Sequence, residues 1–181
     1  MKRLLILSIL LTLLMSGCFF LPIGNLSNTA TFSKEEMLAM DDSDLYDALI
    51  IRFLDVEPET LNQAQRTVAT LLTFDAEVMN GGLCQFFTND YYGYAQYVSD
   101  ALGQVGAAEM QKHYSDFLTN NQIDVTRMDL FHTSSIEDYL KQLERYPYES
   151  FDSTFYEIYQ RENLFDLLLT YVRLHADTVL E

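Results

Sequence analysis

The sequence predicts an all-α fold, a compact single domain of about seven to nine short helices that begins at residue 33. From there onward apolar residues recur at spacings of three and four, the period of a helix with one buried face. No segment alternates apolar and polar residues for long enough to indicate a strand. Cap residues and glycines divide this stretch into segments of the length that helices have in globular domains.

The first two helices are predicted from their N-terminal caps. Ser33 followed by Glu36 has the spacing of a capping box, so a short helix should run to Met40. Asp42 or Ser43 is expected to cap a second helix. Its apolar face is formed by Leu45, Leu49, Ile50 and Phe53.

The third helix should open at Pro58 and Thr60 and end at the pair Gly81-Gly82. A glycine after the last apolar turn is a common C-terminal stop, because glycine adopts a positive φ without strain. A brief helix, Leu83–Thr88, is expected to follow. If φ at Gly82 is positive, Gly82→Val should lower the free energy of unfolding by more than about 1 kcal/mol.

Five further helices are expected in the second half of the chain. They span Tyr94–Leu102, Ala108–Leu118, Ile136–Arg145, Phe151–Tyr159 and Glu162–Leu180. Gly103 and Gly106 should close the first of these, while Ser135 should cap the third and Pro147 should stop it. The polar stretch Asn120–Thr133 is predicted to be a loop.

Residues 1–17 have the pattern of a lipoprotein signal peptide. Two positive charges precede the apolar run Leu4–Leu14, which is shorter than the roughly 20 residues that a membrane-spanning helix needs. The small residues Ser16-Gly17 stand directly before Cys18, and the segment therefore resembles a bacterial lipoprotein signal. In that class the cysteine receives diacylglycerol and becomes the mature N-terminus. The alternative is an ordinary secretory signal with an incidental cysteine.

Lipidation of Cys18 implies a protein of the cell envelope, anchored to the outer membrane facing the periplasm or to the cell surface, depending on the host. Residues 18–32 then form a tether, and residues 33–181 form the all-helical domain. The membrane is the first expected partner, because each buried CH₂ group of an acyl chain contributes about 0.8 kcal/mol. Cys84 is then the one remaining free thiol, so no intramolecular disulfide is expected.

The charge of the chain argues against direct binding of DNA or RNA. It has 11 basic and 27 acidic side chains, a net charge of −16. Removal of residues 1–17 leaves 9 bases against 27 acids, a net charge of −18. A nucleic-acid binder needs a basic patch that displaces counterions from phosphate, and a few scattered cations do not supply one. The acidic balance suits a basic protein partner, or serves solubility alone.

Acidic residues concentrate at the start of the domain. The candidate interaction surface comprises Glu35, Glu36, Asp41, Asp42, Asp44 and Asp47. Like charges one helical turn apart repel by a few tenths of a kcal/mol, so an uncompensated cluster reduces stability. Two interpretations stay open, a surface for a basic partner and a solvated face that keeps the protein soluble.

No residue pattern predicts a metal site, a cofactor or a catalytic centre. His113, His132 and His175 lack the i, i+4 pairing that places two metal ligands on one helix face. His113 and His175 are expected to be hydrogen-bonded core or rim residues. Cys84 would be a nucleophile only with a base within about 3 Å, and its neighbours favour a buried inert thiol. We therefore expect a protein that is not an enzyme and needs no cofactor.

The densest motif is the run from Glu77 to Asn89, EVMNGGLCQFFTN. It places a glycine pair, polar side chains and two aromatic rings at one predicted corner. Its candidate binding residues are Glu77, Asn80, Gly81, Gly82, Gln85, Phe86, Phe87 and Asn89. A corner needed for folding and a small polar pocket are alternative interpretations. A third is an enzyme site at Asn80–Asn89 that uses Cys84 together with Glu77.

This run resembles the E-x-x-N-G-G-x-x-Q-[FY]-[FY]-x-N signature of a bacterial family of domains of unknown function, whose best-known member is an acidic DNA mimic. Two further segments, Ala101–Ala107 and Phe151–Tyr156, are similar to other parts of that family. The resemblance covers about Asp42 to Val179. It implies an all-helical fold and no established catalytic activity. It also implies that carboxylates can stand where DNA presents phosphates and so occupy a DNA-binding protein.

The sequence as a whole predicts a lipid-anchored, acidic, all-helical binding protein outside the cytoplasm that catalyses no reaction. The negative field would steer a basic partner, so binding should weaken strongly with salt. The alternative function from the resemblance is DNA mimicry toward a DNA-binding protein.

Overall fold

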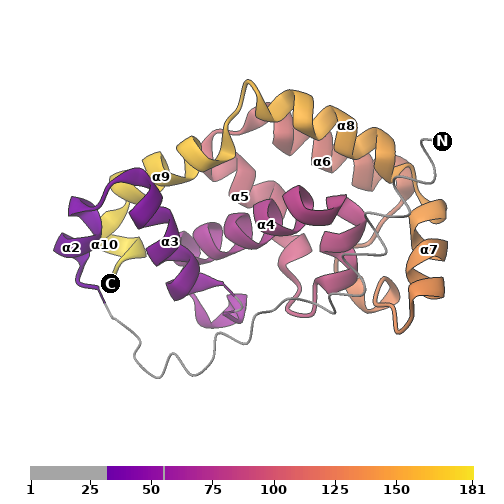
Figure 1. Ribbon diagram of the computed structural model, residues 1–181, viewed down its shortest axis with the longest axis horizontal. Helices are drawn as coiled ribbons and strands as arrows, with labels where there is room; N and C mark the ends of the chain where they lie inside the picture. Colours follow the sequence, from indigo (N-terminus) through magenta and orange to yellow (C-terminus); the bar gives the residue numbers. More distant parts are fainter. Residues whose placement is uncertain (1–31, 55) are drawn as a thin grey trace. The chain divides into compact units, whose positions relative to one another are not determined.

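All regular structure in residues 32–54 and 56–181, which the computed structural model describes, is helical (Figure 1). This part of the chain contains nine α-helices and no strand, so the predicted fold class is confirmed. Residues Ser33–Glu181 form one compact unit. The predicted signal peptide, Cys18 and most of the tether lie outside the described residues.

The long helix α4 (Gln63–Asn89) contacts most of the other elements. The other α-helices are α2 (Lys34–Ala39), α3 (Asp42–Phe53), α5 (Val98–Val105), α6 (Ala108–Asn121), α7 (Ile136–Arg145), α8 (Tyr148–Tyr159), α9 (Leu164–Leu174) and α10 (Ala176–Val179). The short 3₁₀ turns are η1 (Pro58–Thr60), η2 (Tyr94–Gln96) and η3 (Met128–Leu130). No helix of the described residues is both long and apolar enough to cross a membrane.

The beginning and the end of the unit pack together. Helix α2 contacts α10, and α3 contacts α9 (Figure 1). Lys34 Nζ forms an ion pair with Asp177 Oδ1 at 2.8 Å, and Arg173 pairs with Asp42. Surface ion pairs contribute little, so the attachment of α2 and α3 depends mainly on their buried apolar residues. These residues are Met37, Leu45, Ala48, Leu49 and Phe53.

Aromatic rings fill the centre of the core. The Phe74 ring on α4 meets those of Phe86, Tyr114 and Phe155 edge-on, with centroids 5.1, 5.6 and 5.7 Å apart. Both Phe86 and Phe87 are fully buried. Edge-to-face contacts of this kind stabilise beyond the area that they bury. The two phenylalanines of the motif are therefore core residues.

Several predicted helix boundaries are confirmed. Ser33 forms both bonds of the capping box, donating from its backbone N–H to Glu36 Oε2 at 2.8 Å and accepting from Glu36 N at 3.2 Å. Ser135 caps the helix Ile136–Arg145, which has the predicted bounds. Gly106 closes α5 with a φ of 83°. Each of these signals acts within one turn of the chain, so the local sequence determines it.

Two predicted starts are wrong. The cap of α3 is Asp41, whose Oδ1 accepts a bond from Asp44 N at 3.0 Å, and neither Asp42 nor Ser43. The segment Pro58–Thr60 is a separate 3₁₀ turn, and α4 starts only at Gln63. Competing acidic and polar residues stand side by side at both places, and each is a good cap.

Other boundaries also differ from the predictions. Helix α6 extends to Asn121 and η3 interrupts the predicted loop. Helix α8 starts at Tyr148, directly after Pro147, and the segment predicted as one helix to Leu180 divides at His175. Near Tyr94 the chain first forms a 3₁₀ turn, and α5 starts at Val98.

Candidate functional site

Helix α4 bends at the glycine pair of the motif. Gly81 has φ −150° and ψ 18°, and Gly82 has φ 79° and ψ 178°, both outside the helical region. The chain is helical up to Asn80 and again from Leu83 to Asn89. The glycines therefore end one helix and start the next without an intervening loop, and the positive φ expected at Gly82 is confirmed.

The position of Gly82 is explained by Asp152 on α8. Asp152 Oδ1 accepts a hydrogen bond from Leu83 N at 2.9 Å, which caps the second part of α4. A Cβ atom on Gly82 would lie 2.2 Å from Asp152 Oδ2. Burial raises the pKa of Asp152, while the Leu83 N–H opposes that shift. Only glycine fits here, because the backbone conformation and the neighbouring carboxyl group both exclude a side chain.

The polar residues of the motif brace the same corner. A Cβ atom on Gly81 would lie 2.0 Å from Gln85 Oε1, so the Gln85 side chain folds over this glycine. Gln85 Nε2 donates to Glu77 Oε2 at 2.8 Å, and Asn89 Nδ2 donates to the same oxygen at 2.9 Å. One carboxylate oxygen thus joins the two parts of α4 across the break.

The structure brings together most of the candidate motif residues. Glu77, Gln85 and Asn89 form a hydrogen-bonded group, while Phe86 and Phe87 belong to the core. The Asn80 side chain is exposed and forms no hydrogen bond with the described residues. The contacts that the motif makes are those of a folding corner, and its polar groups are largely engaged with one another.

Glu77→Ala is expected to lower the free energy of unfolding by about 1–3 kcal/mol, because hydrogen bonds to charged groups contribute about that much. Glu77→Gln keeps an acceptor oxygen and should lose less than half of this. Urea unfolding followed by circular dichroism measures both, with Glu144→Ala on exposed α7 as the control. Equal stability of Glu77→Ala and Glu144→Ala would contradict the bracing role.

Cys84 is a buried free thiol next to this corner. Its side chain is 1% exposed, and burial raises the pKa of the thiol to about 12. The thiolate is the nucleophilic form of cysteine, and at neutral pH almost none of it exists at such a pKa. The expected burial of Cys84 is confirmed.

The two histidines expected in the core or at its rim both lie against aromatic rings. His113 Nε2 is 3.0 Å from Phe151 O, and its ring stacks on Phe151 with centroids 4.3 Å apart. His175 is exposed and packs on Tyr171 at 4.4 Å. Within the part of the chain that the structure describes, no group of three or more His, Cys, Asp or Glu side chains is arranged to hold a metal ion.

Three fully or partly buried carboxyl groups were not predicted as site residues, and all three lie on α4 or contact it. Asp75 on α4 and Asp90 at its C-terminal cap are buried, whereas Asp152 on α8, which bonds to Leu83, is only half-buried. Asp90 is 4% exposed and accepts bonds from Tyr94 N and Ala95 N, at 2.6 and 2.8 Å. Asp75 is 8% exposed, and its Oδ2 accepts a bond from the Tyr46 hydroxyl at 3.2 Å. Burial raises the pKa of each. Asp90 precedes Tyr91-Tyr92-Gly93, and an aspartate shortly before a glycine is a turn signal. No local pattern distinguishes Asp75 from the other acids.

The raised pKa of Asp75 predicts a pH dependence of stability. Its carboxyl group binds a proton more tightly in the folded chain than in the unfolded one. The resulting stabilisation is fully present below the unfolded pKa of about 3.9 and is lost as pH rises through the folded pKa. Relative to Asp75→Asn, the wild-type chain should therefore gain stability as pH falls from 7 toward 4. Urea midpoints of both proteins across this range test the sign, and a constant difference would contradict it.

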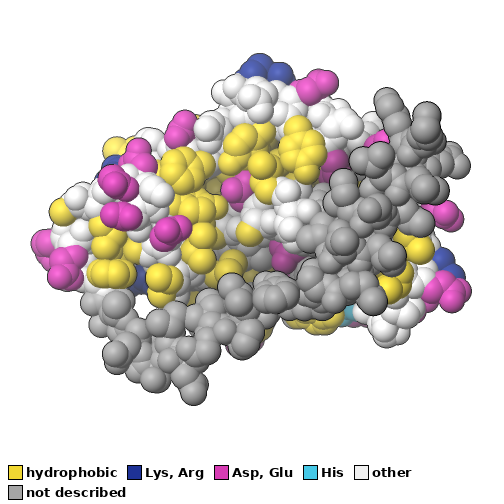
Figure 2. All heavy atoms as spheres, in the orientation of Figure 1, with side chains coloured by type: hydrophobic (Ala, Val, Ile, Leu, Met, Phe, Trp, Pro, Cys, Tyr) yellow, Lys and Arg dark blue, Asp and Glu magenta, His cyan; other side chains and the backbone are white. Residues whose placement is uncertain are grey.

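The six acidic residues of the predicted interaction surface divide into two groups. Glu36 and Asp41 cap helices, and Asp42 pairs with Arg173. The other three, Glu35, Asp44 and Asp47, form no ion pair with any described residue. Figure 2 shows carboxylates gathered over α2 and α3.

One exposed face of α3 combines charge with an apolar side chain. Asp44, Asp47 and Ile51 follow at spacings of three and four and therefore lie on the same side of the helix. All three are exposed, and Ile51 retains 61% of its accessible surface. We call Glu35 and these three residues the acidic face. It presents three unpaired carboxylates, two of which share a side of α3 with an uncovered isoleucine.

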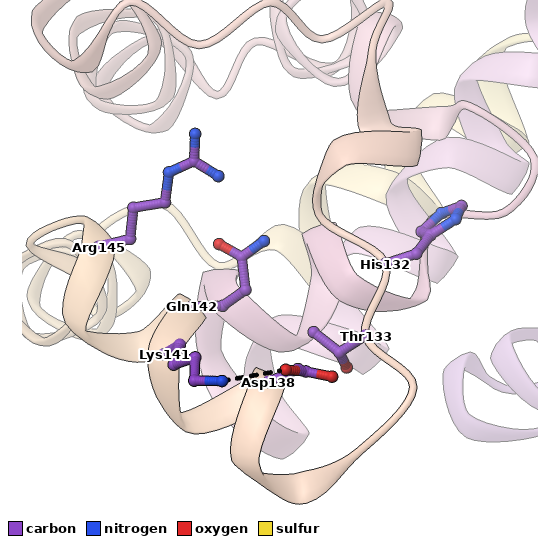
Figure 3. Close-up of a pocket in the computed structure, with 6 residues that line it drawn as sticks. All are labelled: His132, Thr133, Asp138, Lys141, Gln142 and Arg145. Carbon is purple, nitrogen blue, oxygen red and sulfur yellow. Dashed lines mark hydrogen bonds and ion pairs between the residues drawn. The ribbon is translucent and has the colours of Figure 1, made fainter.

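A shallow hollow lies at α7, on a different part of the domain. Figure 3 shows its lining, which consists of His132, Thr133, Asp138, Lys141, Gln142 and Arg145. Lys141 pairs with Glu137 and Asp138, at 3.0 and 3.4 Å, and the Arg145 guanidinium lies over the Tyr146 ring. The charge of Lys141 is therefore balanced by two carboxylates, whereas Arg145 forms no ion pair with any described residue.

The protein is a small helical domain built around the motif Glu77–Asn89. This motif breaks the central helix at its glycine pair, and its two phenylalanines belong to the aromatic core. Residues 59–175 match the family of DMP19-like proteins, and the chain belongs to that family. The resemblance to the DNA-mimic family is thereby confirmed. The matched segment contains the corner and most of the core, but α2 and α3, which carry the acidic face, precede it. No curated protein and no solved structure was found to match the chain.

Proposed function

We propose that the protein is a lipid-anchored binding protein of the cell envelope, which holds a basic protein partner on its acidic face and catalyses no reaction. The observation that carries the proposal is the outward side of α3, where Asp44 and Asp47 precede the exposed Ile51 and form no ion pair with any described residue. An apolar anchor surrounded by polar groups is the usual anatomy of a protein interface.

The anchoring part of the proposal rests on Cys18. Its position behind a charged start, a short apolar run and two small residues is that of a lipidated cysteine. In the native host, we expect the mature chain to begin at Cys18 with acyl chains attached and to sediment with membranes. Intact-mass measurement and membrane fractionation test this, beside a Cys18→Ala variant. A soluble, unmodified chain of full length would overturn the envelope location.

The non-catalytic part is supported by the corner of α4. The one thiol there is buried and protonated at neutral pH, and Glu77 is occupied by two amide donors. A site that performs chemistry needs a group free to act on a substrate.

Capture of a partner tests the binding function. The chain would be immobilised and exposed separately to envelope and cytoplasmic extracts of the native host. The variant Glu35→Gln/Asp44→Asn/Asp47→Asn removes the charges of the acidic face. The matched control Asp100→Asn/Glu144→Gln/Glu157→Gln changes the net charge equally at exposed positions on α5, α7 and α8. We expect an envelope protein that the control captures and the acidic-face variant does not.

A second candidate function is DNA mimicry toward a DNA-binding protein, and family membership favours it. It requires a partner protein whose binding site for DNA overlaps its binding site for this chain. In the same capture experiment, duplex DNA should then displace the partner. Displacement of a DNA-binding protein from the cytoplasmic extract would replace the envelope proposal with this one.

A further inference from the structure

The Asp75 carboxyl group is only half satisfied. Its Oδ2 accepts the hydrogen bond of Tyr46, whereas Oδ1 is buried and has no hydrogen-bond partner among the described residues. The Tyr159 hydroxyl also faces the carboxyl group and lowers its pKa, but makes no bond of normal geometry to Oδ1. A buried carboxylate oxygen without a partner is unfavourable, and a cation would relieve it.

Tyrosine rings from two helices lie beside this carboxyl group, and each of them contacts a phenylalanine. The rings of Tyr46 on α3 and Phe165 on α9 are in contact, with centroids 4.9 Å apart, and Tyr159 on α8 packs on Phe155 at 5.9 Å. Tyr156, one turn before Tyr159, is 40% exposed. Figure 2 shows hydrophobic side chains gathered on one face of the domain with carboxylates between them. Ring faces attract cations, most strongly where water is excluded.

Acidic charges act on both tyrosines. Asp47 acts on Tyr46, and Asp166 acts on Tyr159. No Lys, Arg or His of the described residues forms an ion pair with Asp75. The carboxyl group, the rings and the nearby charges therefore all favour the same kind of ligand, a cation.

We propose that the surface formed by Tyr46, Asp75 and Tyr159 receives an arginine side chain of the basic partner. The two tyrosine rings turn aside, the guanidinium lies between them, and its N–H groups donate to Asp75 Oδ1. Arginine fits better than lysine, because its planar, weakly hydrated guanidinium stacks on aromatic rings and can donate two parallel hydrogen bonds to a carboxylate. The existence of a basic partner rests on the proposed function, and Asp47, next to Tyr46 in the chain, belongs to the acidic face.

Titration with a single-residue probe tests the site without the partner. Nα-acetyl-arginine methylamide would be added to the ¹⁵N-labelled chain, and Nα-acetyl-citrulline methylamide would serve as its uncharged isostere. We expect the arginine probe to shift the NMR signals of Tyr46, Asp75 and Tyr159, and the citrulline probe to leave them unchanged. Shifts confined to other residues, or equal shifts with both probes, would overturn the proposal.

Variants separate the carboxylate from the rings. Asp75→Asn should weaken binding of the arginine probe by about tenfold, the effect of losing one charge-assisted hydrogen bond. Tyr46→Phe keeps the ring but removes a donor from Asp75, so its affinity should equal or exceed that of the wild-type chain. Glu144→Gln on exposed α7 is the control and should stay within about twofold. The proposed arginine site would be contradicted if Asp75→Asn bound the arginine probe as tightly as the wild-type chain. Loss of probe binding in a correctly folded Tyr46→Phe variant would also contradict it.

This result is independent of the partner capture. If the probe fails but capture still depends on the acidic face, the proposed function stands and the arginine site is wrong. If the probe binds but capture does not depend on the acidic face, the arginine site stands and the proposed function is wrong.

Discussion

Gly82→Ala is expected to lower the free energy of unfolding by about 3 kcal/mol or more. The backbone at Gly82, with φ 79° and ψ 178°, lies in a region that essentially only glycine adopts, and holding another residue there costs about 1–3 kcal/mol. The new Cβ atom would also lie 2.2 Å from Asp152 Oδ2, so the carboxyl group must move and lose its bond to Leu83 N. Loss of a hydrogen bond to a charged group adds about 1.5–3 kcal/mol.

Gly106→Ala provides the comparison. Gly106 also has a positive φ, 83° against 79°, but its ψ is 15° where that of Gly82 is 178°, and a Cβ atom there would have nothing within 4 Å. It should therefore show only the cost of the left-handed conformation, about 1–2 kcal/mol. Urea unfolding of both variants gives the difference between them, which reports the Asp152 contact together with the stricter backbone conformation at Gly82. Equal losses for the two variants would contradict the account of the corner.

The parts of the fold that the sequence predicted correctly are those that act over short distances. The capping box of Ser33, the cap at Ser135 and the closing glycine at Gly106 each involve residues within one turn. Helical periodicity is likewise a local property, so the fold class followed from it. One error fell where two adjacent residues are equally good caps, at Asp41 and Asp42.

The parts that could not be predicted depend on contacts between distant positions. Asp152 caps Leu83 across 69 positions, and no local signal marks an aspartate on one helix as the cap of another. Asp42 was grouped with the unpaired acids, but Arg173, 131 positions away, neutralises it. Sequence reasoning could therefore locate the acidic segment but not identify which of its carboxylates stay unpaired.

The motif shows the same division within thirteen residues. Its members were recognisable together because they are close in the chain, and they also meet in space through Glu77. Their arrangement explains why glycines, an amide and a carboxylate are required at this corner. It does not by itself indicate a partner, which is why the functional proposal rests on the acidic face instead.

Neutralising the acidic face should weaken binding of the captured partner by about 3- to 150-fold. The loss of three unpaired carboxylates, each contributing about 0.2–1 kcal/mol to an exposed ion pair, amounts to about 0.6–3 kcal/mol. The control variant Asp100→Asn/Glu144→Gln/Glu157→Gln removes the same total charge and should lose much less, because its carboxylates lie elsewhere. Unequal losses therefore report local contacts and not the overall field of the protein.

The most direct test of the proposed function is the dissociation constant of the captured partner for the wild-type chain, the acidic-face variant and the control, at low and high salt. Charges on exposed surfaces interact over about 10 Å at 0.1 M salt and over about 3 Å at 1 M. We expect the wild-type chain and the control to bind tightly at low salt and weakly at high salt, and the acidic-face variant to bind weakly at both. Equal, salt-insensitive affinities for all three proteins would contradict a function based on the acidic face.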